Sequence, residues 1–264
     1  MASLLKLGAK GKDVQSLQQA LKDHGFNPGA VDGDFGAGTE QAILGFQRSQ
    51  GMLADGVAGP RTRTALGLIT DAALPDATPS MSVQVASRMC PDAQLDNIKT
   101  HLPVLLTSLA AHSLADRMMV LMAVATIRAE TAGFVPINEG RSKFNTSPGG
   151  APFDLYDRRA DLGNTASPDG ERYRGRGFVQ LTGRHNYECY GGRLNVDLIA
   201  HPELANAAEV AADLLSVFLG DRELNIKDAL MHGNMAAARR LVNGGSHGLA
   251  DFTDAYQIGA SLLQ

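Results

Sequence analysis

Two glutamates nine residues apart, Glu130 and Glu139, have a residue type and spacing that could support acid–base chemistry. Glu130 follows an apolar stretch over residues 118–127, and a carboxyl group beside an apolar core should have a raised pKa and hold a proton near neutrality. Glu139 lies in a polar segment, residues 138–143, which should keep it ionised. One protonated and one charged carboxyl group is the minimum set for hydrolysis of a glycosidic bond.

The spacing of the two glutamates favours a mechanism that inverts the anomeric carbon. Inversion needs an acid on one face of the sugar and a base-bound water on the other, with the carboxyl groups about 6.5–9.5 Å apart. Nine residues that begin at a helix end and continue in a loop can fold back to such a gap. Two glutamates at i and i+4 of one helix would lie closer together.

The elements that position these glutamates are expected to be mainly helical. The stretch 118–130 is too short to span a membrane and predicts a buried helix, with Glu130 in its last turn, where the helix dipole disfavours a negative charge. Apolar spacing predicts further helices around residues 102–109 and over 207–219, 235–242 and 249–262. The polar stretch from Gly133 to Phe178 is long for a compact domain, which suggests a role in substrate binding.

An internal repeat marks a separate N-terminal domain. Residues 32–39 and 55–62 share the pattern D-G-x-x-G-x-x-T, in which the Asp-Gly pair suits a tight turn and the threonine would cap the following helix. Before the first copy, Asp13 would cap a helix that carries Val14, Leu17 and Leu21 on one face. The pattern predicts a small three-helix domain over residues 1–68, with a short last helix.

This segment resembles the peptidoglycan-binding domain found at one end of many cell-wall hydrolases. The resemblance covers Leu7 to Leu66 and includes the two D-G-x-x-G units. It implies peptidoglycan glycan strands as the partner, and it identifies no individual contact residues. Residues 69–81 contain Pro75, Pro79 and small side chains without apolar periodicity, so we predict a linker there.

A second motif runs from Tyr173 to Tyr187, YRGRGFVQLTGRHNY, and Asn243-Gly-Gly follows later in the chain. Together with the two glutamates, these blocks resemble the catalytic core of family 19 glycoside hydrolases, which contains chitinases and phage endolysins. The resemblance spans residues 82–264. It implies an all-α, lysozyme-like or chitinase-like catalytic domain linked to the small N-terminal one.

The resemblance also implies roles for individual residues. Glu130 matches the family's general acid, and Glu139 would be the base that activates water. The substrate-binding residues would be Tyr173, Gln180, Thr182, Asn186 and Asn243. Thr182 could donate to Glu139 or orient the water, and Tyr173 could stack on a sugar ring.

Structural roles compete with several of these assignments. Tyr173 could instead pack in a core, and Asn243 before Gly-Gly could be only a helix C-cap. Arg174 and Arg176 could simply brace the long loop. It is the combination of separated motifs that favours the catalytic interpretation.

Composition narrows the class of protein. The 264 residues are 44% apolar and 20% charged, which is typical of a soluble globular protein. The net charge of −4 argues against a nucleic-acid binder and gives no attraction to anionic membranes. Two cysteines, Cys90 and Cys189, form no framework and are expected to be free and buried, and the seven histidines show no metal-ligand spacing. We expect a monomer without cofactor or metal.

Several functions remain open at this level. The main hypothesis is an endolysin that hydrolyses β-1,4 bonds of peptidoglycan by an inverting mechanism. The N-terminus lacks the apolar core of a signal peptide, so the protein would stay in the cytoplasm until a holin or another route released it to the wall. Ala129 stands where chitinases place a histidine, which weakens the case for chitin. A chitinase, a secreted interbacterial toxin of the same chemistry, and an inactive wall-binding or virion protein are the alternatives.

Deletion of residues 1–68 tests the predicted division of labour. We expect weaker binding to cell walls, because the tethered module raises the local substrate concentration, and unchanged hydrolysis of small soluble glycans. Wall pull-down and soluble-glycan assays measure the two effects separately. Equal loss in both assays would contradict separate modules.

Overall fold

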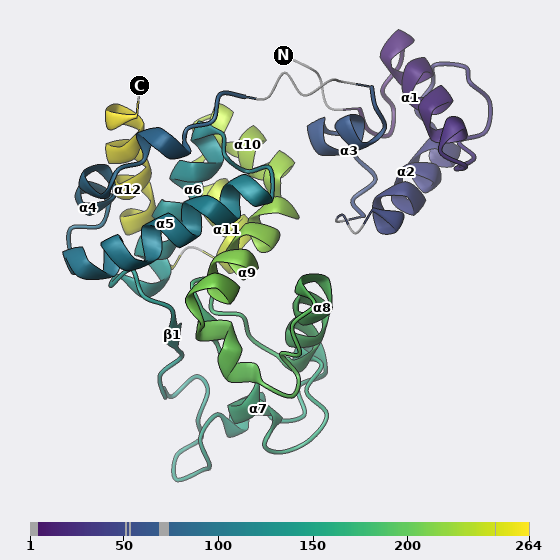
Figure 1. The fold of residues 1–264 in the computed structure, drawn as a ribbon. Coiled ribbons are helices and arrows are strands. Elements are labelled where there is room, and N and C mark those ends of the chain that lie inside the picture. The colour runs from purple at the N-terminus through teal and green to yellow at the C-terminus, as the bar shows by residue number, and fades with distance from the viewer. Residues whose placement is uncertain (1–4, 51, 53, 69–73, 246, 264) are drawn as a thin grey trace. The chain divides into compact units, whose positions relative to one another are not determined.

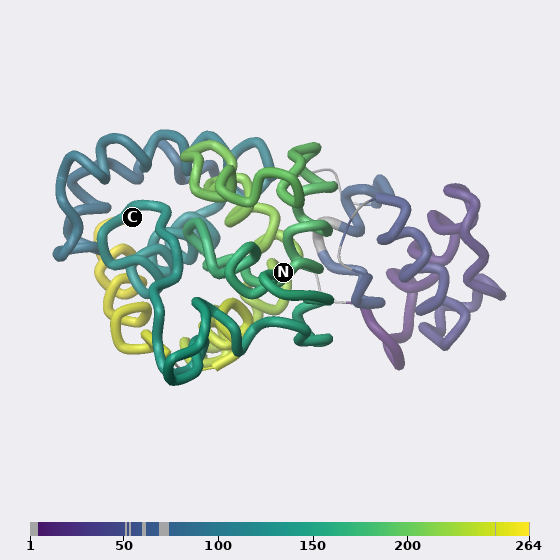
Figure 2. The backbone as a smooth tube through the Cα atoms, turned by 90° about the horizontal axis from the view of Figure 1, so that it is seen from below, coloured from purple at the N-terminus to yellow at the C-terminus, as the bar shows by residue number. Residues whose placement is uncertain are grey.

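The computed structural model describes residues 5–50, 52, 54–68, 74–245 and 247–263. The chain divides into two compact units, residues 1–74 and 75–264, each with its own hydrophobic core. Both units are mainly helical, which confirms the predicted fold class (Figures 1 and 2).

The boundary between the units differs from the predicted linker. Residues 69–73 of that linker lie outside the described residues. Residues 76–81 pack on the second unit: the Ala77 amide donates to the Ala115 carbonyl at 2.8 Å, and Met81 is buried in the second core. The second unit therefore begins about seven residues earlier than the sequence predicts.

Within its described residues the first unit contains three helices, as predicted: α1 (Lys12–Asp23), α2 (Ala37–Ser49) and the short α3 (Pro60–Ala65). Its core combines one face of α1 with one face of α2 around Phe35 and Phe46. The predicted caps are wrong. Glycines occupy the N-cap positions of all three helices, Asp13 lies in the first turn, and the two repeat threonines lie inside their helices.

A buried glutamine holds each repeat turn. The Gln18 amide oxygen accepts from the Gly33 amide at 2.9 Å, and its nitrogen donates to Asp32, the Asp34 carbonyl and Thr39 at 2.9–3.1 Å. Gln47 repeats this pattern in the second turn with Gly56, Asp55, the Val57 carbonyl and Thr62. Each repeat threonine is thus an acceptor for a glutamine of the preceding helix, which explains why the pattern needs it.

The second unit holds nine α-helices, four short 3-10 helices and one two-stranded sheet within the described residues. In chain order they are η1 (Thr78–Ser80), α4 (Val83–Met89), α5 (Leu95–Ala111), α6 (Arg117–Thr131), β1 (Ile137–Asn138), η2 (Asp154–Tyr156), η3 (Ala160–Leu162), α7 (Asp169–Arg172), β2 (Arg176–Gly177), α8 (Arg184–Leu194), η4 (Pro202–Asn206), α9 (Ala208–Gly220), α10 (Glu223–Met231), α11 (Met235–Asn243) and α12 (Leu249–Leu262). We call residues 137–206 the loop lobe and the remainder of this unit the helical lobe.

The helical lobe surrounds α6, the helix predicted from the apolar stretch. Every residue from Met119 to Ile127 is buried, and α6 packs against α4, α9, α10 and α12. No helix in the described part of the chain has the length and apolar character needed to cross a membrane.

In the view of Figure 1, the loop lobe lies below α9 and the rest of the helical lobe. Its antiparallel strands pair Ile137 with Gly177 and Asn138 with Arg176. Helix α9 belongs to both cores: Ala211 and Leu215 face the α6 core, whereas Leu214 and Val217 join the loop-lobe core with Tyr187 and other residues. One helix therefore fixes the loop lobe against the helical lobe.

Arginines cover the aromatic rings of the loop lobe. The guanidinium groups of Arg172 and Arg184 both lie over Tyr173, at 5.6 and 5.7 Å from the ring centre, and Arg176 lies over Tyr187 at 5.7 Å. Such contacts are worth about 0.5–2 kcal/mol each, and the long aliphatic stems add apolar cover. These arginines therefore add cover to the tyrosines of the loop-lobe core.

The repeat glutamines yield a stability prediction. Gln18→Ala and Gln47→Ala should each lower the free energy of unfolding of the first unit by about 2 kcal/mol, because a buried glycine amide loses its acceptor. Gln19→Ala, an exposed neighbour on α1, is the matched control and should change it by less than about 0.5 kcal/mol. Hydrogen exchange followed by mass spectrometry on the full chain reports each unit separately. Equal protection in all three variants would contradict the role of these glutamines.

Candidate active site

Glu130 lies in the last turn of α6, as predicted, and pairs with a buried arginine. Its Oε1 is 2.8 Å from Nη2 of Arg239 on α11, and the two side chains are 13% and 0% exposed. The Nε of Arg239 donates to the His247 carbonyl at 3.0 Å, whereas Nη1 and Nη2 make no hydrogen bond among the described residues, so Nη2 contacts Glu130 as an ion pair only. The ion pair therefore carries most of the compensation for this buried charge.

This pairing corrects the expected surroundings of Glu130. The sequence places the carboxyl group beside an apolar core, but the structure places a guanidinium against it. The C-terminus of a helix disfavours a carboxylate, and a cation at 2.8 Å offsets that cost. Arg239 was missed because only its i, i+4 spacing to Asn243 hints that it shares a helix face with a site residue.

Asn243 belongs to the same cluster as Glu130. It is the last residue of α11, and the C-cap is Gly244 at φ 70°. Its Nδ2 donates to the His247 carbonyl at 2.7 Å, and its Oδ1 accepts from the Gly245 amide at 2.9 Å. Asn243 and Arg239 thus hold one carbonyl together, and substrate contact by Asn243 stays a prediction.

Glu139 follows β1 in the loop lobe and accepts three hydrogen bonds. Oε1 accepts from Tyr156 Oη at 2.8 Å and from Asn145 Nδ2 at 3.0 Å, and Oε2 accepts from the Gly175 amide at 3.0 Å. The carboxylate of Glu139 is thus held in place by three donors from three segments of the loop lobe, and its role as a base stays a prediction. Because Oε1 is doubly occupied, Oε2 is the oxygen with room for a further donor.

Burial and the neighbouring Glu139 raise the pKa of Tyr156 to about 12. The phenol therefore keeps its proton at any physiological pH and serves as a permanent donor to Glu139. Sequence reasoning missed both Tyr156 and Asn145, since neither lies in a motif and Tyr156 is 17 residues from its partner.

Gly175 brings Gln180 next to Glu139. A Cβ at position 175 would lie 2.9 Å from Gln180 Oε1 and 3.1 Å from Glu139 Oε2, so any larger residue would displace both. The Gln180 nitrogen donates to the carbonyls of Ile137 and Gly177, each at 3.1 Å, which directs the amide oxygen toward Gly175. Gln180 adopts φ 51°, an uncommon conformation that persists only where surrounding contacts hold it.

Thr182 and Asn186 continue this arrangement away from Glu139. Thr182 Oγ1 donates to the Gln180 carbonyl at 2.8 Å, so the predicted donation to Glu139 is wrong in this structure. Asn186 Nδ2 donates to the Thr182 carbonyl at 2.7 Å. Both residues are partly buried and support the Gln180 backbone, and their contact with a sugar stays a prediction.

Tyr173 does not have the role that the sequence assigns to it. Its side chain is 1% exposed and packs on Tyr187 at 5.4 Å between ring centres. Because the Tyr173 ring is almost fully covered by other side chains, neither face can contact a sugar. The alternative interpretation, that Tyr173 packs in a core, is therefore correct. Arg176 likewise braces the loop, donating to the carbonyls of Arg172 and Arg174 and to the Tyr187 hydroxyl.

The segment between the two glutamates is anchored in the core. Ala132 and Phe134 adopt φ values of 50° and 56°, which turn the chain out of α6. Phe134 is fully buried and lies 6.3 Å from Phe178, which follows β2 directly. The strand pairing and this aromatic contact therefore fix the course of the chain from Glu130 to Glu139.

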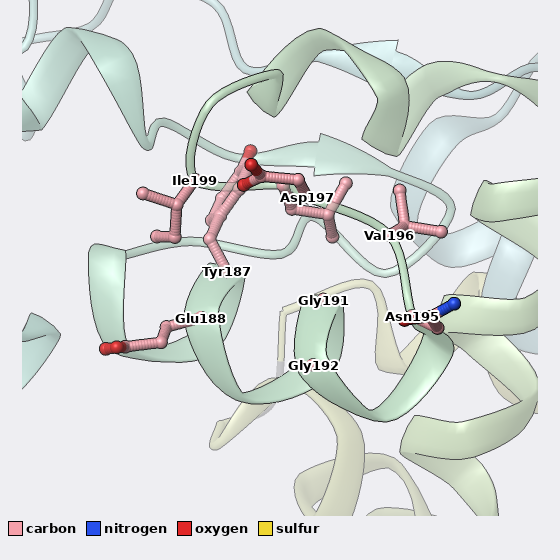
Figure 3. Close-up of a pocket in the computed structure, with 9 residues that line it drawn as sticks. Tyr187, Glu188, Gly191, Gly192, Asn195, Val196, Asp197 and Ile199 are labelled. Atoms are coloured by element: carbon pink, nitrogen blue, oxygen red, sulfur yellow. The ribbon is translucent and has the colours of Figure 1, made fainter.

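A separate pocket of about 340 Å³ lies between α8 and the turn over residues 195–199 (Figure 3). Its lining includes Tyr187, Glu188 and Asp197, and none of the predicted site residues. The chemistry that the sequence predicts thus lies elsewhere in the loop lobe and at the end of α6.

The described residues were also considered for a metal site and for a reactive cysteine. No cluster of three or more histidine, cysteine or acidic side chains suited to a metal ion occurs in the described ranges. Both cysteines are free: Cys90 is buried, and Cys189 is exposed, contrary to the prediction. Burial raises the pKa of the Cys90 thiol to about 12, which makes it a poor nucleophile.

The N-terminal part of the chain and the longer region that extends into the second unit are similar to different known proteins. Residues 10–66 match the family described as "Putative peptidoglycan binding domain". N-acetylmuramoyl-L-alanine amidase CwlM of Mycobacterium tuberculosis is 48% identical over 56 residues, which cover 21% of this chain and 14% of the relative. A glycosyl hydrolase family 19 domain-containing protein of Haemophilus influenzae is 29% identical over 112 residues, 39% of this chain and 48% of the relative.

The chain is modular. It joins a peptidoglycan-binding domain to a domain similar to family 19 glycosyl hydrolases, which confirms the architecture that the sequence predicts. The alignment with the family 19 protein is longer than the whole first unit, so it must include residues of the second. This chain spans less than half the length of either curated relative. Chitinase C of Streptomyces griseus has 19% identity and a TM-score of 0.45, over 69% of this chain and 77% of that one.

A double-mutant cycle tests the pairing at the end of α6. Arg239→Met should lower the free energy of unfolding of the second unit by about 3 kcal/mol, because it leaves a largely buried carboxylate unpaired. The double variant Glu130→Gln/Arg239→Met should lose about 1–2 kcal/mol less free energy of unfolding than the sum of the losses in the two single variants. Arg240→Met, exposed on the same helix, is the control and should change stability by less than about 0.5 kcal/mol. Strictly additive effects in urea unfolding would contradict a direct pair.

Proposed function

We propose that this protein is a bacteriolytic endolysin-type enzyme that hydrolyses β-1,4 glycosidic bonds of peptidoglycan, held on the wall by its first unit. The observation that carries the proposal is the environment of Glu139. Three hydrogen-bond donors fix the position of its carboxylate, and Oε2 and the Gln180 amide oxygen both lie next to Gly175. Such a pair of acceptors suits an attacking water.

In the proposed reaction, Glu139 removes a proton from water while the oxygen attacks the anomeric carbon. Glu130 gives its proton to the glycosidic oxygen, the bond to the leaving sugar breaks, and the configuration inverts. This role requires the protonated form of Glu130, and the guanidinium group of Arg239 stabilises the carboxylate that remains after the transfer.

Two alternative functions share the proposed chemistry. One differs in the substrate, and the other differs in how the protein is delivered to the cell wall. A chitinase would release soluble sugars from colloidal chitin, whereas the proposed enzyme would clear suspensions of cell walls. The peptidoglycan-binding match over residues 10–66 favours the wall as substrate. An interbacterial toxin would share the chemistry and differ only in delivery. We propose that the protein stays in the cytoplasm before its release, and fractionation of producing cells tests this by measuring the amount of protein in the cytoplasmic fraction.

Replacement of each glutamate tests the mechanism. Glu130→Gln and Glu139→Gln should each lower kcat on purified sacculi by about 10³-fold or more, since general acid–base catalysis contributes about 10²–10⁴. Glu188→Gln, an exposed carboxylate on α8, is the matched control and should retain full activity. Reducing-sugar release gives the rate, mass spectrometry of the fragments gives the bond, and NMR of the first product should show the α-anomer.

If either variant loses only a small part of kcat while its circular dichroism spectrum is unchanged, the replaced glutamate is not the general acid or base that we propose. Complete retention of lysis by Glu130→Gln would show that lysis does not depend on this acid, whereas failure of the wild type itself to lyse walls would revive the interpretation of an inactive wall-binding protein. A β-anomer as first product would replace the inverting mechanism by a retaining one.

A further inference from the structure

Phe144 is the most exposed large apolar side chain in the described part of the chain, at 76%. The ammonium group of the neighbouring Lys143 lies 5.2 Å from the ring centre. Full exposure of a phenylalanine forgoes about 2 kcal/mol of hydrophobic stabilisation. A single exposed apolar side chain is not by itself evidence of a binding surface, so the position of Phe144 relative to Glu139 decides its interpretation.

The position of Phe144 is tied directly to Glu139. Its neighbour Asn145 is 1% exposed and donates to Glu139 Oε1 at 3.0 Å and to the Gly140 carbonyl at 2.8 Å. The Asn145 oxygen accepts from the Ser142 amide at 2.8 Å, and the Phe144 amide donates to Ser142 Oγ at 3.2 Å. The turn over residues 142–145 is thus closed by hydrogen bonds, and the same asparagine holds both the turn and the proposed base.

We propose that Phe144 and Lys143 form a substrate-contact surface beside Glu139 for a glycan strand that carries carboxylate groups. The apolar face of a sugar ring packs on Phe144, and the Lys143 ammonium attracts a carboxylate of the peptide substituents. This inference rests on the proposed function and makes it more specific, because chitin is neutral and offers nothing to Lys143. Phe144 takes the stacking role that the sequence assigned to the buried Tyr173.

A membrane is the competing ligand for an exposed aromatic beside a lysine. Insertion of Phe144 into a bilayer would bring Glu139, joined to it through Asn145, against the lipid headgroups. A glycan strand could not then reach the proposed base. The connection to Glu139 therefore favours the glycan.

Kinetics of the full-length protein on purified sacculi test the proposal. Phe144→Ala should raise KM about tenfold with kcat reduced less than threefold, and Phe144→Trp should restore KM to within twofold. Lys143→Gln should raise KM at low salt and flatten its dependence on ionic strength. Leu95→Ala, which truncates a 49% exposed apolar side chain on α5, is the matched control and should leave both constants unchanged. Melting temperatures of all four variants should match that of the wild type, because the side chains are exposed.

Three results would overturn the inference. The first is a KM of Phe144→Ala within twofold of the wild type. The second is an unchanged salt dependence in Lys143→Gln. The third is loss of binding of Phe144→Ala to vesicles of phosphatidylethanolamine and phosphatidylglycerol without a change in KM, which would assign the surface to a membrane. Failure of the wild type to cut sacculi at all, or full activity of Glu139→Gln, would instead overturn the proposed function and the inference with it.

Discussion

The second unit depends on a helix that is buried along its length and must carry charge at both ends. Asp116 accepts from the first amides of α6 and contacts Lys227 of α10 at 2.6 Å, and Glu130 at the other end contacts Arg239 of α11. The dipole of α6 favours the first carboxylate and disfavours the second. Arg239 offsets the unfavourable dipole at Glu130, whereas the buried Lys227 pairs with two buried carboxylates, Asp116 and Glu223, each at 2.6 Å, so α10 and α11 each supply one cation to α6.

The loop lobe is packed in a different way, because its core combines aliphatic side chains with three buried tyrosines. Arginines lie over tyrosine rings at the edge of this core, and their guanidinium groups also bond backbone carbonyls. A lobe braced in this way tolerates the polar groups that a site for sugars requires. Glu139, Gln180 and Asn145 could not be gathered in an aliphatic core without unsatisfied hydrogen bonds.

The two lobes give the two glutamates opposite surroundings. Glu130 faces a cation at the end of a helix, whereas Glu139 lies among neutral donors on a strand end. Two carboxylates held in different ways can take different parts in one reaction. The Phe134–Phe178 contact and the strand pairing keep these surroundings in a fixed relation, which a sugar polymer bound to both would require.

Local patterns were sufficient for several helices and for the three-helix layout of the first unit, but not for its helix caps or for α4, α8 and α10. The apolar run of α6, the bounds of α12 and the paired D-G-x-x-G turns all follow from side chains a few residues apart, because helix periodicity and turn chemistry act over that range. Tertiary structure alone decided that Tyr173 is buried and Phe144 exposed, and that Arg239, Asn145 and Tyr156 bond the glutamates. These contacts join residues from 6 to 109 positions apart. Their geometry depends on how whole elements pack, and no periodicity in the sequence records it.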